Sequence, residues 1–159
     1  MKAASVSALK SELSRLSSTE LRDVSLKLAR FRTENKELLT YLLFYDNDEA
    51  GYIKSVKEEI DLLFDGINTN HLYFVRKSIR KIIRLVNKYI RFSGNKQTEV
   101  ELRLYFVSKL QKSGIALEPG SALGNLFIGQ AQKIKKAIAG LHEDLQYDYQ
   151  SELAKFGLD

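Results

Sequence analysis

Apolar residues return every three or four positions along nearly the whole chain, and this spacing constrains the fold more than any other feature. Few residues interrupt the pattern, since the 159 residues include one proline and nine glycines. The pattern therefore predicts an all-α protein of about seven or eight helices. The expected helices span residues 3–16, 18–31, 34–46, 49–66, 71–92, 97–113, 121–140 and 142–156.

A capping box marks the clearest helix start. The hydroxyl of Ser17 can accept a hydrogen bond from the backbone of Glu20, whose carboxylate can reach back to the backbone amide of Ser17. This pair predicts that the second helix begins directly after Ser17.

Composition predicts a single soluble domain over residues 1–159. The hydrophobic share is 44%, enough for a core without disulfides, and the lack of cysteine excludes disulfide frameworks and thiolate metal sites. The longest apolar run, residues 41–45, is too short to cross a bilayer. The N-terminus lacks the apolar centre of a signal peptide, so a cytoplasmic location is expected.

Two all-α architectures fit this pattern, an irregular helical bundle and a short α-solenoid-like stack of helical hairpins. Arg30-Phe31 is followed by Asn35-Lys36 and a helix rich in Leu, Tyr and Phe, and the same order recurs at Arg91-Phe92 and Asn95-Lys96. A true repeat would favour the stack, whose concave surface usually binds a partner. Chance similarity between two amphipathic helix pairs is the alternative.

The short Leu-rich helices of residues 17–45 and 90–106, with the run RLYFVSKL at residues 103–110, carry a resemblance to a known family. The chain resembles an uncharacterised bacterial all-helical domain family with no assigned activity. This resemblance implies a helical fold and a bacterial source, and it identifies no functional residue.

The motifs of common helical enzymes are incomplete in this sequence. His142-Glu143 opens an H-E-x-x-H pattern, but Gln146 stands where the second histidine is needed. The glycines at residues 120–129 lack the G-K-[ST] end of a phosphate-binding loop. We therefore expect no catalytic residue, metal or cofactor, and no small-molecule ligand.

The most informative segment is residues 72–92, which contains seven cations and no acid. At about 100° per residue, the cations fall within an arc of roughly 140°, and a separate arc of roughly 100° is apolar. The basic arc also contains a tyrosine whose ring can stack on a nucleic-acid base. The candidate binding residues are Tyr73, Arg76, Lys77, Arg80, Lys81, Arg84, Lys88 and Arg91.

Two kinds of partner can neutralise this basic arc. The preceding segment, residues 46–65, has seven acids against two lysines, so an antiparallel hairpin would bring opposite charges together. The other partner is an external polyanion, whose phosphates the cations would bind. The position of the acids Glu58, Asp61 and Asp65 distinguishes the two interpretations.

The sequence therefore predicts a non-enzymatic helical binding or scaffold protein, with another protein as the expected partner. The alternative is nucleic-acid (polyanion) binding through the basic helix 72–92, by contact with the backbone because no sequence-reading module is present. The oligomeric state stays open at this point.

Overall fold

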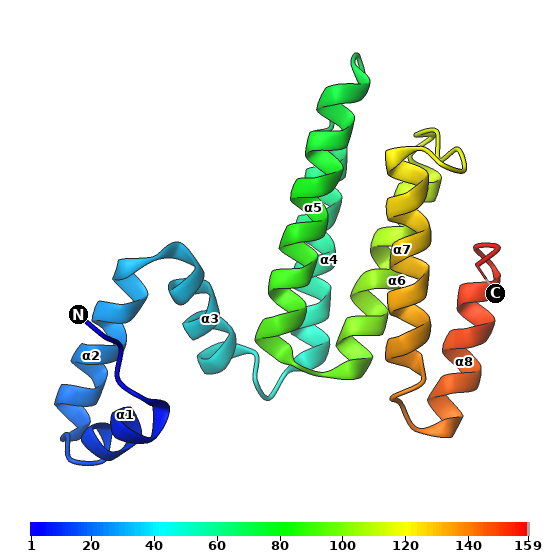
Figure 1. Ribbon diagram of the computed structural model, residues 1–159. Coiled ribbons are helices and arrows are strands. Elements are labelled where there is room, and N and C mark those ends of the chain that lie inside the picture. Colours follow the sequence, from blue (N-terminus) through cyan, green and yellow to red (C-terminus); the bar gives the residue numbers. More distant parts are fainter. Residues whose placement is uncertain (159) are drawn as a thin grey trace. The chain divides into compact units, whose positions relative to one another are not determined.

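The computed structural model describes residues 1–158, and this part of the chain contains eight α-helices and no strand (Figure 1). The all-α prediction is therefore confirmed. The helices are α1 (Val6–Leu13), α2 (Ser18–Phe31), α3 (Thr33–Phe44), α4 (Glu49–Asp65), α5 (Leu72–Ser93), α6 (Lys96–Lys112), α7 (Ala122–Ile138) and α8 (Glu143–Ala154).

The predicted helix ends lie close to the observed ones, except at α1. This helix is shorter than the predicted residues 3–16 because serines cap both of its ends. The hydroxyl of Ser5 accepts a hydrogen bond from the amide of Ala8 at 3.2 Å, and the hydroxyl of Ser14 donates to the carbonyl of Lys10 at 2.9 Å.

The chain divides into two compact units, unit 1 (Met1–Phe44) and unit 2 (from Tyr45 to the C-terminus). In unit 1, α2 and α3 pack against each other and Arg32 is the C-cap of α2. The predicted capping box is confirmed, since the amide of Ser17 donates to Glu20 at 2.8 Å and the amide of Glu20 donates to the Ser17 hydroxyl at 3.3 Å. The sequence predicts that residues 1–159 form a single domain, that is, one unit that folds cooperatively. This stays a prediction.

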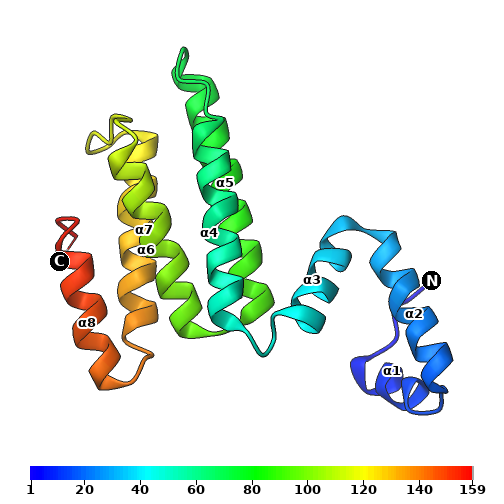
Figure 2. The same cartoon turned by 180° about the vertical axis from the view of Figure 1, so that it is seen from behind.

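Unit 2 is a helical bundle built on two helical hairpins, α4–α5 and α6–α7, with α8 beside α7 (Figures 1 and 2). Helix α6 is central because it packs against α4, α5 and α7. Its buried side chains point in several directions rather than along a single apolar stripe. They are Thr98, Val100, Leu102, Arg103, Leu104, Phe106, Val107 and Leu110.

The two halves of the suggested sequence repeat are not equivalent in the structure. Asn35 lies inside α3, and its side-chain amide donates to the carbonyl of Leu28 at 2.9 Å. Asn95 is instead the N-cap of α6, where its side chain accepts from the amides of Gln97 and Thr98. The sequence similarity therefore does not mark the same position in two copies of one hairpin.

Candidate binding site on helix α5

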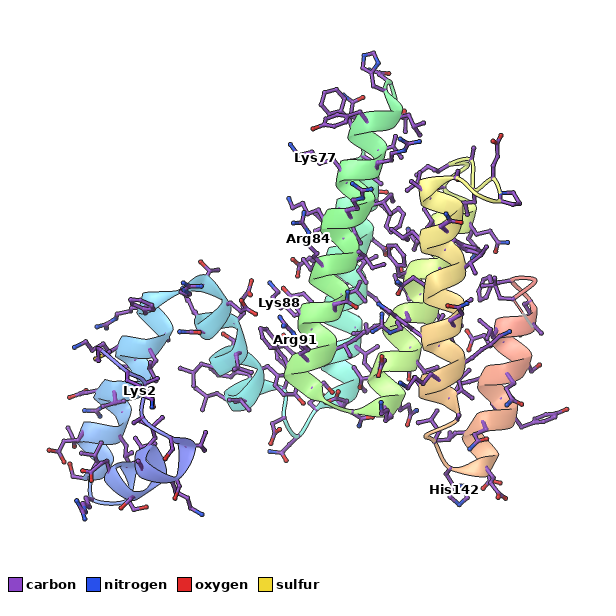
Figure 3. The ribbon with its side chains drawn as sticks, in the orientation of Figure 1. Lys2, Lys77, Arg84, Lys88, Arg91 and His142 are labelled. Carbon is purple, nitrogen blue, oxygen red and sulfur yellow. The ribbon has the colours of Figure 1, made fainter. Side chains whose placement is uncertain are left out.

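Helix α5 buries apolar residues and leaves most of its basic residues exposed, in two separate arcs as its sequence predicts. The side chains of Val75, Ile79, Ile82, Val86 and Ile90 are buried in unit 2. Figure 3 shows Lys77, Arg84, Lys88 and Arg91 on the same side of the helix. The helix ends at Gly94, whose φ of 66° is a left-handed conformation that glycine adopts without strain.

Five of the eight predicted site residues line one open hollow of about 600 Å³ on the surface of unit 2. The hollow is lined by Tyr73, Arg76, Lys77, Arg80, Ile83 and Arg84. Tyr73 is 69% exposed, so its ring is available for stacking. The structure therefore brings a ring and four cations together around one concave surface.

We define the basic face as Arg76, Lys77, Arg80, Lys81 and Arg84. Within residues 1–158, no carboxylate forms an ion pair with any of these five side chains. The Nε atom of Arg84 donates to the carbonyl of Arg80 at 3.2 Å. The Nε atom of Arg76 is shielded from solvent and has no acceptor in the described part of the chain.

The acids of α4 contact α6 and other parts of unit 2 rather than the basic face. Asp61 accepts from the hydroxyl of Tyr105 at 2.7 Å and forms an ion pair with Lys109 at 2.8 Å. Glu59 accepts from the hydroxyl of Tyr89 at 2.8 Å. Glu58 is exposed and lines a different hollow, between α4 and α6. The internal pairing considered from the sequence is therefore absent for the basic face within residues 1–158.

The two remaining predicted cations have different surroundings. The ammonium group of Lys88 lies 4.7 Å from the centre of the Tyr89 ring. Lys88 and Arg91 both take part in further interactions. Their part in ligand binding stays a prediction, and the basic face is defined without them.

Sequence reasoning missed a buried polar cluster centred on Arg103, which is only 6% exposed. Its Nε donates to Glu99 at 3.0 Å, and its Nη1 donates to the side-chain oxygens of Asn87 at 3.0 Å and Gln130 at 2.9 Å. The cluster links α5, α6 and α7. Its only sequence signal is one arginine inside the otherwise apolar and aromatic run of residues 102–107.

A second polar cluster joins α4 to α6 at the hollow of about 530 Å³ between them. The hydrogen bond from Lys109 lowers the pKa of Asp61 below its ordinary value. Burial, with the hydrogen bond to Asp61, raises the pKa of Tyr105 to about 12. The carboxylate of Asp61 accepts from the Tyr105 hydroxyl and pairs with the Lys109 ammonium. We therefore interpret the cluster as a structural contact between α4 and α6.

The raised pKa of Tyr105 predicts a loss of stability at high pH. A pKa that is higher in the folded state gives a contribution that is complete below the ordinary value of 10.0 and is lost as the pH rises towards about 12. We expect the thermal unfolding midpoint to fall above pH 10, and to fall less steeply in Tyr105→Phe. Tyr73→Phe, at an exposed ring, is the control and should follow the wild type. Equal slopes for Tyr105→Phe and the wild type would contradict the assignment.

No family model, curated protein or solved structure matches this chain, so function is argued from its own geometry. The resemblance to a bacterial helical family stays a prediction. Among residues 1–158, no group of three or more His, Asp or Glu side chains is placed to hold a metal ion. No helix in this range has both the length and the apolar character needed to span a membrane.

Proposed function

We propose that this protein is a non-enzymatic binding protein whose basic face on α5 binds a polyanion, and that the polyanion is nucleic acid. One observation carries the proposal: five cations lie on one side of a surface helix without a carboxylate partner in residues 1–158. We expect the protein to act in the cytoplasm.

The electrostatics of α5 favour an external anion. Arg76, Arg80 and Arg84 follow one another at i, i+4 spacing, where like charges repel by a few tenths of a kcal/mol per pair. An anion that lies along this row removes the repulsion. Binding of phosphates by such cations also releases the counterions condensed on the nucleic acid, which supplies most of the affinity of non-specific complexes.

The dimensions of the basic face suit a phosphate backbone. A helix rises about 1.5 Å per residue, so Arg76 and Arg84 lie about 12 Å apart along the axis, the length of three to four nucleotide steps of one strand in a duplex. The exposed ring of Tyr73 at one end of the hollow adds a surface on which an unpaired base can stack.

Fluorescence anisotropy with labelled single- and double-stranded oligonucleotides tests this function. We expect binding at low salt that weakens as salt is added. If five phosphates are neutralised, the slope of log K against log salt is about −3.5 for single strands and about −4.5 for duplexes. No binding to either oligonucleotide at low salt would contradict the proposal. The basic face would then be interpreted as a site for another protein, the partner expected from the sequence.

A further inference from the structure

Unit 1 exposes a set of large apolar side chains on α1 and α2, which we call the seam. Its members are 37–84% exposed. They are Val6, Leu9 and Leu13 of α1, and Leu21, Val24, Leu28 and Phe31 of α2. The four residues on α2 follow at i, i+3, i+7 and i+10, which places them within an arc of roughly 80° at 100° per residue.

The seam is separate from the face through which α2 packs on α3. That packing face contains the buried Ala29, and Leu26 lies beside it at the hollow shared with Leu39 and Leu43 of α3. Helix α2 therefore has one apolar face that packs on α3 and one that does not. An apolar face of this kind on a surface helix typically marks an interaction site.

The size of unit 1 indicates that it gains stability from association. Only two of its residues, Ala29 and Tyr41, are buried. A unit of about 40 residues usually depends on disulfides, a metal or oligomerisation. The chain has no cysteine, and residues 1–158 contain no cluster that can hold a metal. Association with a second copy is a route that needs neither a disulfide nor a metal.

We propose that the seam is a homodimer interface, covered by the seam of a second copy of this chain. The 3-4-3 spacing on α2 is that of helices that pair side by side, so the surface is complementary to itself and suits a two-fold dimer. Helix α2 contains three cations and two acids, so two copies meet without strong repulsion. This balance distinguishes the seam from the basic face on α5.

The exposed area of the seam is close to what a dimer needs. A large side chain presents roughly 150–250 Å², so seven at about half exposure offer on the order of 600 Å² per copy. A standard interface buries about 800 Å² per partner, and the polar residues that flank the seam supply the difference. Such a dimer would carry two basic faces, one on each chain.

Sedimentation equilibrium of the full chain tests this proposal. We expect a particle of twice the 18.2 kDa chain mass, and a dissociation constant raised more than about 100-fold in Leu28→Glu with Phe31→Glu. The matched control is Leu62→Glu with Leu72→Glu, at side chains of unit 2 that are 73% and 54% exposed, which should stay dimeric. A monomeric wild type, or a dimer that persists in the seam variant, would overturn the proposal.

Cross-linking gives a second readout that does not depend on how the charged variant folds. Because the chain has no cysteine, a single Ser25→Cys beside the seam is its only thiol. We expect a bis-maleimide reagent to cross-link Ser25→Cys into dimers and to leave Ser151→Cys on α8 monomeric. Equal cross-linking of the two variants, or none in either, would also overturn the proposal.

Discussion

Replacement of Arg103 by Met is expected to lower the free energy of unfolding by about 3–5 kcal/mol, because it removes one partner of a buried ion pair. The guanidinium group is the donor to Glu99, Asn87 and Gln130. Without it, the carboxylate of Glu99 and the side chain of Gln130, which is 4% exposed, lose their buried donor. Urea unfolding followed by far-UV circular dichroism measures the loss.

Lys96→Met is the matched control for this prediction. Lys96 pairs with the same carboxylate, Glu99, at 3.5 Å, but its side chain is exposed. An exposed pair of this kind contributes less than about 1 kcal/mol. If Arg103→Met costs no more than Lys96→Met, the cluster around Arg103 does not hold α5, α6 and α7 together.

The double variant Arg80→Glu with Arg84→Glu is expected to weaken nucleic-acid binding by at least about 100-fold. Each arginine contributes about 1.5 kcal/mol as a charge-assisted contact to phosphate, and the new carboxylates add repulsion. Stability should stay within about 0.5 kcal/mol of the wild type, since neither arginine has a carboxylate partner within residues 1–158. Anisotropy and thermal unfolding measure the two effects separately.

The control for this double variant changes the net charge equally at another place. Lys112→Glu with Lys155→Glu alters two exposed lysines that do not line the hollow on α5, and it should change binding only slightly. Equal weakening by both double variants would mean that net charge alone, and no particular surface, drives binding. A loss of stability in Arg80→Glu with Arg84→Glu would instead indicate internal pairing of these arginines.

The elements of the fold could be predicted from the sequence because they depend on neighbours along the chain. The capping box of Ser17 and Glu20 fixes the start of α2 through a contact three residues apart. The division of α5 into two sides likewise follows from its 3.6-residue period, and Val75 and Ile79 are buried as that period requires.

The arrangement of those elements could not be predicted in the same way. The spacing in α6 reveals one apolar stripe, but the helix is buried on several sides because three other helices surround it. The sequence does not distinguish Arg103 from an ordinary surface cation, because its partners Asn87 and Gln130 lie on other helices. The direction of Asp61 towards Tyr105 rather than towards α5 also depends on contacts distant in sequence.

The side chains of the candidate site could be predicted from the sequence, but the groups that surround them could not. The sequence identified the cations of α5 and Tyr73, because they share one arc of a helical wheel. It left open whether the acids of residues 46–65 cover them, and only the packing of α4 on α6 answers that question. The residues that line the hollow, Tyr73, Arg76 and Arg84 among them, all belong to α5.

The salt dependence of nucleic-acid binding, compared between the wild type and Arg80→Gln with Arg84→Gln, tests the central claim most directly. Each phosphate contact that is removed makes the slope of log K against log salt less steep by about 0.9 for a duplex. The account predicts a difference of about 1.8 between the two proteins. Equal slopes would mean that the two arginines contact no phosphate and that the basic face is not the binding site.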